Sequence, residues 1–307
     1  MGKIVESPYV IKSILNNPER VPYGVDVIKA REIWNESDKG NNIVIAVIDT
    51  GCDYNHPDLD GAIIDGYNFT NDDQGNSANY MDYRGHGTHV AGIIAAREDN
   101  SGIVGVAPNS NLLILKAIDR NGKGNVRGII KAINYAINWR GPDNHRVSII
   151  NMSLGAVQHN EELYEVIKDA RKLGILLVAA AGNESDGKAY TQEISYPGFY
   201  QEVIQVGSIN KNLEISPFSN SNMNLDFVAP GGTVLSTFLN GDYAELSGTS
   251  MATPYVTGAL ALILNIVGKN LLEPIDISFL CYSYLLKRAK RLGFSALEEG
   301  NGLIQLV

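Results

Sequence analysis

The feature that most constrains the fold of this chain is a run of six apolar residues, IVIAVI at residues 43–48, which leads directly into Asp49. Such a run is typical of a strand buried on both faces of a parallel sheet. Apolar runs of the same kind follow at residues 111–118, 147–155, 174–183 and 203–209. Helical patterns at residues 128–139 and 162–174 lie between them. This alternation predicts an α/β fold with a mostly parallel central sheet.

Polar side chains stand where several of the predicted strands end. Asp49 ends the first strand, and Asn183 follows another. Asn151 and Ser153 lie at the end of a third. Because ligands of open α/β sheets bind outside the carboxyl ends of the strands, we expect the functional site at this edge.

Length, charge and cysteine content narrow the class of protein. The 307 residues fit one large α/β domain. With 34 acidic and 25 basic residues, the net charge is −9, which argues against nucleic-acid binding because that function needs clustered positive charge. The first residues lack the pattern of a signal peptide, and no apolar run approaches the roughly 20 residues of a membrane helix. Cys52 and Cys281 are too few for a disulfide framework. We expect a soluble, cytoplasmic protein with no nucleic-acid or membrane partner.

Two histidines lie three residues apart in the stretch YRGHGTHVAG, residues 83–92. They are candidates for a metal pair, a catalytic base or core packing. The common helical zinc motif, His-Glu-x-x-His, carries a glutamate between its histidines, whereas Gly87 and Thr88 stand between His86 and His89 here. The spacing therefore disfavours zinc. His89 precedes a run of apolar residues and is expected to be a packed, hydrogen-bonded core residue.

A serine stands at the predicted start of a buried helix. Residues 246–267 are apolar nearly all round, which indicates a helix through the centre of the protein. Pro254 is tolerated near a first helical turn, so we expect the helix to start close to Ser250. A hydroxyl there is either a helix cap or a nucleophile. With Asp49 and His86 it completes the residue types of an acid–base–nucleophile triad, although spacing alone does not bring the three together.

Three separated motifs carry a family resemblance: VIDTG around Asp49, GHGTHVAG around His86 and SGTSMATP around Ser250. Matching segments between them include HPDL, GVAPNSNLLILKAI, INMSLG, AAAGNE and SYPGFY. In this order the chain resembles the subtilisin-like serine proteases from about Val21 onwards. The resemblance implies a three-layer fold with a mostly parallel sheet flanked by helices. It also implies an N-terminal extension at residues 1–18 and a peptidase domain at residues 19–307.

The resemblance assigns chemical roles to four residues. Asp49, His86 and Ser250 would form the catalytic triad. Asn183 would be the side-chain donor of the oxyanion hole, with the backbone N–H of Ser250 as the second donor. The alternative for Asn183 is a left-handed turn residue that closes its strand.

The same resemblance predicts how a polypeptide substrate binds. Substrate would pair as an added β-strand with two edge segments. One segment comprises Lys123, Gly124, Asn125 and Val126, and the other comprises Ser153, Leu154 and Gly155. The pocket for the residue before the cut would be lined by Gly155, Ala180, Gly182 and Ser195, with Glu184 at its rim. Small lining residues favour a large apolar or aromatic side chain, and Glu184 would admit a basic one.

A structural calcium ion is also implied by the resemblance. Its ligands would be the side chains of Glu19, Asp58 and Asp99, with carbonyl groups of Arg97, Ser101 and Ile103. Glu19 stands where the family has glutamine, and either side chain supplies oxygen. The alternative is that the three acids are unrelated surface residues.

The short segment before Val21 resembles that of the intracellular subtilisins of spore-forming bacteria. In those proteins an N-terminal element with a Pro-Tyr pair lies across the active site and blocks it, and the matching stretch here is ESPYVIK, residues 6–12. We expect this extension to act as an inhibitor that the enzyme removes up to about residue 17. The alternative is an N-terminal arm that packs on the surface. The resemblance also suggests a homodimer.

Two classes of function remain for comparison. The first is an intracellular serine endopeptidase of broad specificity that works through an acyl-enzyme. The alternative is a pseudoprotease, a protein of this fold that serves as a binding or regulatory partner. Loss of a triad residue would indicate the second class, and all three residue types are present.

Overall fold

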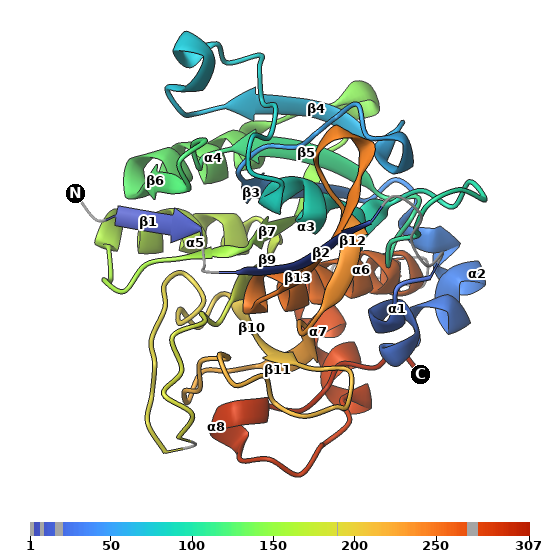
Figure 1. Cartoon of the computed structure of the whole chain (residues 1–307), viewed down its shortest axis with the longest axis vertical. Helices are drawn as coiled ribbons and strands as arrows, with labels where there is room; N and C mark the ends of the chain where they lie inside the picture. Colours follow the sequence, from blue (N-terminus) through green and yellow to red (C-terminus); the bar gives the residue numbers. More distant parts are fainter. Residues whose placement is uncertain (1–2, 7–8, 16–20, 189, 269–275) are drawn as a thin grey trace.

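A seven-stranded, entirely parallel sheet forms the centre of the molecule (Figure 1). The computed structural model describes residues 3–6, 9–15, 21–188, 190–268 and 276–307. In spatial order the strands are β11 (Phe227–Pro230), β10 (Ile204–Ile209), β9 (Leu176–Ala180), β7 (Val147–Met152), β3 (Val44–Asp49), β5 (Asn111–Lys116) and β4 (Ile63–Asn68). The predicted α/β fold with a parallel sheet is confirmed. The sequence patterns indicated five of these strands and missed β4 and β11.

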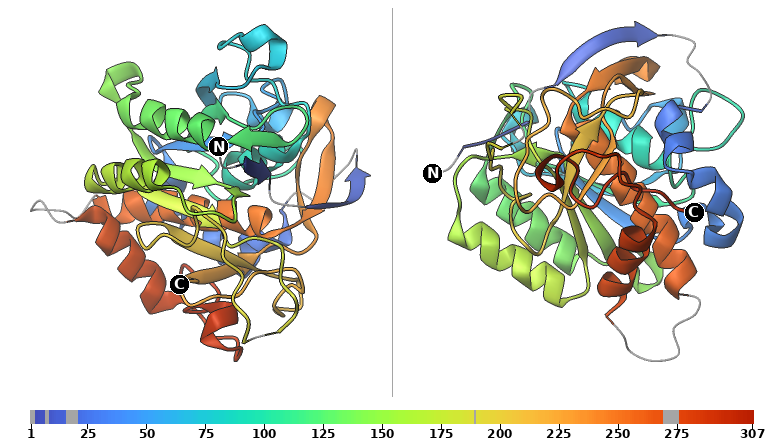
Figure 2. Two further views of the ribbon diagram at one scale, coloured as in Figure 1. Left: turned by 90° about the vertical axis from the view of Figure 1, so that its left-hand side faces the viewer. Right: turned by 90° about the horizontal axis from the view of Figure 1, so that it is seen from below.

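Helices cover both faces of the sheet, which gives three layers (Figure 2). One face packs against α4 (Val126–Asn138) and α5 (Glu161–Lys172). The other packs against α3 (His86–Ala95), α6 (Thr249–Gly268) and α7 (Ile277–Arg288). The short helices α1 (Tyr23–Val27) and α2 (Trp34–Ser37) join this second layer, and α8 (Ala296–Glu299) lies near the C-terminus. The central strands are buried because both of their faces meet a helix layer.

Helix α6 runs through the core and carries the serine motif at its start. Among the described residues it is the one helix long and apolar enough to cross a membrane, but 83% of the relevant window is buried inside the protein. Buried core helices often have this composition, so it is weak evidence for a membrane. The helix begins at Thr249, close to Ser250 as predicted, and Pro254 is its sixth residue, just beyond the first turn. The site geometry described below explains why it is tolerated there.

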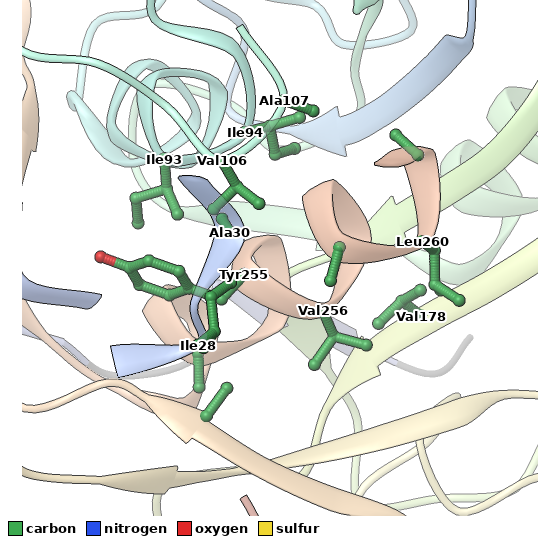
Figure 3. Close-up of a cluster of buried hydrophobic side chains, with 14 of the residues drawn as sticks. Ile28, Ala30, Ile93, Ile94, Val106, Ala107, Val178, Tyr255, Val256 and Leu260 are labelled. Atoms are coloured by element: carbon green, nitrogen blue, oxygen red, sulfur yellow. The ribbon is translucent and has the colours of Figure 1, made fainter. Parts of the chain in front are cut away.

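Tyr255 packs in the centre of this second layer, close to Ile28 and Ala30 in Figure 3. The side chain is buried, and burial raises the pKa of its hydroxyl well above the ordinary value. A Cβ atom added to Gly24 would lie 2.2 Å from the ring of Tyr255. The missing side chain at residue 24 therefore makes room for the tyrosine between α1 and α6.

Two small antiparallel sheets flank the central sheet, and the N-terminal segment contributes one strand to each. Strand β1 (Lys3–Glu6) lies between β6 (Lys123–Asn125) and β8 (Leu154–Gly155). Strand β2 (Val10–Leu15) pairs with β13 (Tyr243–Ser247), whose other neighbour is β12 (Val234–Thr237). The N-terminal segment is thus bound as β-strand on two separate parts of the domain (Figure 1).

Candidate active site

A buried aspartate and a buried histidine are in direct contact at the carboxyl edge of the sheet. Asp49 is the last residue of β3, and its Oδ1 lies 2.7 Å from Nδ1 of His86. The same oxygen accepts a hydrogen bond from the backbone N–H of Thr50 at 2.7 Å. Both side chains are almost completely inaccessible. The carboxylate favours the imidazole tautomer with its proton on Nδ1, which makes Nε2 the basic nitrogen.

Glycines allow this contact to form. Gly85 precedes α3 with a φ of 88°, a left-handed conformation that favours glycine, and His86 is the first residue of the helix. A Cβ atom on Gly87 would lie 2.1 Å from the backbone oxygen of Gly51. Gly87 N–H instead donates to Thr50 Oγ1 at 2.9 Å. The start of α3 can therefore approach the end of β3 closely enough for His86 to reach Asp49.

Lys116 supports the loop after Asp49, a role that sequence patterns did not indicate. It is fully buried near the end of β5, and its Nζ donates to the backbone oxygen of Thr50 at 2.6 Å. Asp72 lies 3.1 Å from the same ammonium group and compensates its charge. The signal in the sequence that could have indicated this role is a lysine inside an otherwise apolar predicted strand.

Ser250 is the second residue of α6, near the helix N-terminus as predicted. Its Oγ donates to the backbone oxygen of Ser153 at 3.2 Å, and Ser153 Oγ donates to the backbone oxygen of Ser250 at 2.9 Å. The second bond explains the position of Pro254, because proline has no N–H to donate to the Ser250 carbonyl four residues earlier. Ser153 supplies the missing donor. In this state the serine hydroxyl is directed to Ser153, so its proton must be redirected to a base before it can attack a substrate.

Asn183 follows β9 and is held against the start of α6. Its Oδ1 accepts hydrogen bonds from the backbone N–H of Thr249 at 2.8 Å and from Thr249 Oγ1 at 2.9 Å. The Nδ2 donor group therefore points away from Thr249. The left-handed turn after the strand is provided by Gly182, with a φ of 106°, rather than by Asn183. Thr249 is a further site residue that sequence reasoning missed, because its role depends on a contact 66 residues away.

The predicted pocket residues come from three segments that the fold brings together. Ala180 ends β9, and Gly155 ends β8. Paired backbone hydrogen bonds of 2.8 Å and 2.7 Å between Ala156 and Tyr196 join the segment that contains Gly155 to the segment that contains Ser195. Glu184 is exposed, but its Oε2 accepts from Asn183 N–H and from Asn220 Nδ2, both at 2.9 Å. Glu184 thus braces the Asn183 loop, and its place at the rim of the pocket stays a prediction.

The two predicted edge segments flank a strand of the chain itself. Residues Lys3, Ile4 and Val5 of β1 pair with Asn125, Gly124 and Lys123, and residues Val5 and Glu6 pair with Gly155 and Leu154. Val126, the last residue of the first segment, begins α4, and Ser153 lies just before β8.

After β1, the N-terminal chain reaches the histidine. The ring of Tyr9 lies 5.0 Å from that of His86, measured between centroids. Ser7 and Pro8, on which the predicted blocking geometry depends, lie outside the described residues.

The second histidine of the pair has a structural role. His89 is fully buried, and its Nε2 lies 3.0 Å from the backbone oxygens of both Val234 and Ala244. Burial lowers the pKa of His89 to about 3, so the ring is neutral. The prediction that His89 is a hydrogen-bonded core residue is confirmed.

Cys52 is also buried. Burial raises the pKa of its thiol well above the ordinary value, and the charges of Asp82 and Asp53 raise it further.

Among the described residues, the predicted calcium ligands gather around Asp58. The Asp58 carboxylate is buried and accepts from Ile103 N–H at 2.7 Å and from Tyr243 Oη at 3.0 Å. Burial raises the pKa of Asp58, and the nearby negative charge of Asp99 raises it further. Arg97 N–H donates to the backbone oxygen of Asp58 at 2.8 Å, so residues 97–103 form a loop around this carboxylate.

These residues fit a hard cation in part. The second acid, Asp99, belongs to the same loop. Its Oδ1 accepts a hydrogen bond from the backbone N–H of Ser101 at 2.9 Å. No cluster of three or more His, Cys, Asp or Glu side chains occurs among the residues described, so carbonyl oxygens would have to complete the shell. Glu19, the remaining predicted ligand, lies outside the described part of the chain. Asp58 is buried and Asp99 is exposed, and a cation between these two acids would offset their repulsion.

One class of chemistry needs an imidazole oriented by a carboxylate, a serine at a helix N-terminus and an amide donor beside it. That class is hydrolysis through a serine nucleophile. The neutral, hydrogen-bonded His89 and the protonated Cys52 offer no competing metal pair or thiolate nucleophile at this place.

Comparison with known proteins identifies the family. A family model described as the Subtilase family matches residues 40–294. The chain is 48% identical over 303 residues to the intracellular serine protease of Paenibacillus polymyxa, which covers 97% of this chain and 89% of that protein. It is 47% identical to the major intracellular serine protease of Bacillus subtilis strain 168, in an alignment that covers 99% of this chain and 94% of that protein. Subtilisin E of the same strain is 40% identical over 80% of this chain and 62% of its own length. The chain therefore belongs to the subtilase family.

These relatives confirm three predictions. The resemblance to the subtilisin-like serine proteases is confirmed, as is the assignment of the chain as a hydrolase of that type. The intracellular location is confirmed because the relatives that match nearly the whole chain are named intracellular proteases.

Proposed function

We propose that this subtilase is an endopeptidase in which Asp49, His86 and Ser250 form the catalytic triad. The observation that carries the proposal is the buried 2.7 Å contact between Asp49 Oδ1 and His86 Nδ1, because it prepares Nε2 to accept a proton. Ser250 Oγ attacks the carbonyl carbon of the substrate and passes its proton to His86. His86 then protonates the leaving amine, and water hydrolyses the resulting acyl-enzyme by the same route.

Two donors stabilise the negative charge that develops on the substrate oxygen. The side-chain Nδ2 of Asn183 is the first, and its orientation is supported by the two bonds from Thr249 to Oδ1. The backbone N–H of Ser250 is the second, favoured by its place near the N-terminus of a 20-residue helix. Asp49 stabilises the imidazolium ion that forms during both steps.

Substrate binds as an extended strand between β6 and β8. The support for this proposal is β1, which occupies that place with antiparallel pairing on both sides. The small residues of the pocket favour large apolar or aromatic side chains before the cut. Because Oε2 of Glu184 already accepts hydrogen bonds from two amide groups, this oxygen is less available to a basic side chain, which is the weaker preference.

Endopeptidase activity is tested with an unfolded polypeptide whose termini are blocked. The wild-type protein is expected to release internal fragments, identified by mass spectrometry, and the Ser250→Ala variant is expected to release none. A pseudoprotease would leave the polypeptide intact in both samples. Fragments produced equally by both proteins would contradict the role of Ser250.

We infer that the N-terminal extension inhibits the enzyme until the enzyme itself removes this extension. The support is that β1 lies in the proposed substrate cleft and Tyr9 packs on His86. The intact mass of the wild type should fall with time as residues up to about Asn17 are lost, while Ser250→Ala keeps its full mass. A pure Ser250→Ala protein that is trimmed at the same bond would show that processing needs another enzyme.

We propose that Asp58, Asp99 and the carbonyl groups of residues 97, 101 and 103 hold a structural calcium ion, with Glu19 as a further ligand. The support is that the carboxylate of Asp58 is buried and that residues 97–103, which include Asp99, form a loop around it. In the Ser250→Ala background, excess EDTA should lower the melting temperature, and Asp58→Asn should remove most of that effect. An unchanged melting temperature in EDTA would contradict the calcium site.

A further inference from the structure

The N-terminal chain marks a second binding strand beyond the proposed substrate cleft. β1 lies in the cleft, Tyr9 contacts His86, and β2 then continues along β13 (Figure 1). The chain therefore passes the catalytic histidine between its two strands. If a substrate runs in the same direction, β13 faces the part of the substrate that follows the cut, the leaving-group side.

The pairing between β2 and β13 is long and depends chiefly on the main chain. It extends from Val10, opposite Ser247, to Leu15, opposite Tyr243, with one irregularity between Glu245 and Leu246. Val10, Ile11 and Ile14 leave 52%, 47% and 56% of their surface exposed, so these apolar side chains contribute little burial. Ser13 makes one side-chain bond, from its Oγ to Glu245 Oε2 at 2.7 Å. Main-chain pairing of this kind accepts many sequences.

One side chain at the far end of β2 is bound more specifically. Leu15, six residues after Tyr9, packs against a small buried cluster. The cluster consists of Ala96, Ile103, Leu235 and Tyr243. It offers an apolar surface to whichever strand lies along β13. The strand edge therefore combines sequence-tolerant pairing with one apolar contact.

Removal of the extension would leave this edge of β13 without its neighbour, because its other edge is paired with β12. An exposed strand edge is a template for pairing with another extended chain. On the basis of the proposed function, we propose that β13 of the processed enzyme binds the leaving-group side of an extended, unfolded polypeptide substrate as far as Tyr243, with preference for an apolar residue at the place of Leu15. A folded domain does not supply such a long extended segment, so the enzyme selects unfolded chains.

The test uses processed wild-type enzyme and four peptides with the same residues up to and just after the cut. The short peptide ends there. The long peptide continues with VIKSIL, the sequence of β2. The third is the long peptide with proline in place of its serine and second isoleucine, and the fourth has aspartate in place of its leucine. Mass spectrometry identifies the bond that is cut, and kcat/KM is measured for that bond alone.

The long peptide is expected to exceed the short one by about tenfold in kcat/KM, because several main-chain hydrogen bonds are added. The proline peptide, which is equally long, should fall back to the level of the short peptide because proline cannot pair with the strand. The kcat/KM of the aspartate peptide should lie between those of the long and the short peptide. Equal rates for long and short peptides, or for the long and proline peptides, would overturn the docking role of β13. If no peptide is cut, the proposed protease function itself fails.

Discussion

Individual side chains at this site are positioned by partners that are distant in the sequence. Asn183 illustrates this, because Thr249 holds the oxygen of its amide, so that the nitrogen points away from Thr249, as its proposed role as an oxyanion donor requires. Its donor function should be stronger in the transition state than in the ground state, because negative charge develops only during the reaction. Mutation of the amide should therefore affect turnover more than substrate binding.

Asn183→Ala is expected to lower kcat by about 100- to 1000-fold with little change in KM, a magnitude measured in the relative subtilisin rather than obtained from this structure. Steady-state kinetics with a short peptide would show this. Asn220→Ala is a useful comparison, because Asn220 braces the same loop through Glu184 without presenting a donor to the substrate. A change confined to KM in Asn183→Ala would argue against the oxyanion role.

His89 makes the stability of the fold dependent on pH. Its pKa is about 3 in the folded protein and about 6.5 when unfolded, so only the unfolded chain binds this proton between those values. The stabilisation is therefore complete above about pH 6.5 and is lost progressively as the pH falls towards 3. Between pH 7 and pH 5 the loss amounts to about 2 kcal/mol of unfolding free energy.

Chemical denaturation at both pH values, in the Ser250→Ala background, checks this expectation. His89→Gln keeps a donor for the two carbonyl oxygens but has no proton to gain, so it should lose about 2 kcal/mol less than the parent between pH 7 and pH 5. An identical loss in the two proteins would mean that His89 is not the titrating group.

At the scale of elements, the core helix α6 depends on its neighbours for both its start and its packing. Pro254 removes one backbone donor, and Ser153 from the segment after β7 replaces it. The same segment therefore supports the proposed nucleophile and forms part of the proposed substrate cleft. Towards α1, the helix presents Tyr255 to Gly24, with no room for a Cβ atom between them.

Gly24→Ala is expected to cost about 1–3 kcal/mol of unfolding free energy, since the added methyl group meets a buried ring that cannot move freely. In a Tyr255→Leu background, which creates space, the same substitution should be nearly neutral or slightly stabilising because Gly24 lies in a helix. Denaturant titration of the four proteins, each carrying Ser250→Ala, gives the coupling. Equal costs of Gly24→Ala in both backgrounds would show that the two residues are not in conflict.

At the scale of the whole molecule, the sequence predicted the elements that are apolar and continuous. The five predicted strands form the middle of the sheet, where burial on both faces requires such runs. Strands β12 and β13 were missed because short hairpin strands mix polar and apolar residues. The motifs around Asp49, His86 and Ser250 pointed to candidate catalytic residues. They did not point to Thr249, Lys116 or Tyr243, whose roles arise only from tertiary contacts.

The placement of the N-terminal segment is also a property of the whole molecule. Its sequence suggested an inhibitory element, and the fold adds that two different sheets bind it. One strand covers the proposed cleft and the other covers β13, so both binding regions would become accessible together on processing. This arrangement would link the proposed release of the segment to the appearance of the complete proposed substrate-binding surface.

The most direct test of the account is labelling with a serine-directed phosphonate probe, followed by intact mass measurement. Processed wild-type protein is expected to gain one probe molecule per chain, full-length protein to react more slowly, and Ser250→Ala to remain unlabelled. His86→Ala should also react far more slowly, because its serine lacks a base. Equal labelling of the wild type and Ser250→Ala, or no labelling of the processed wild type, would contradict the assignment of Ser250 as the nucleophile.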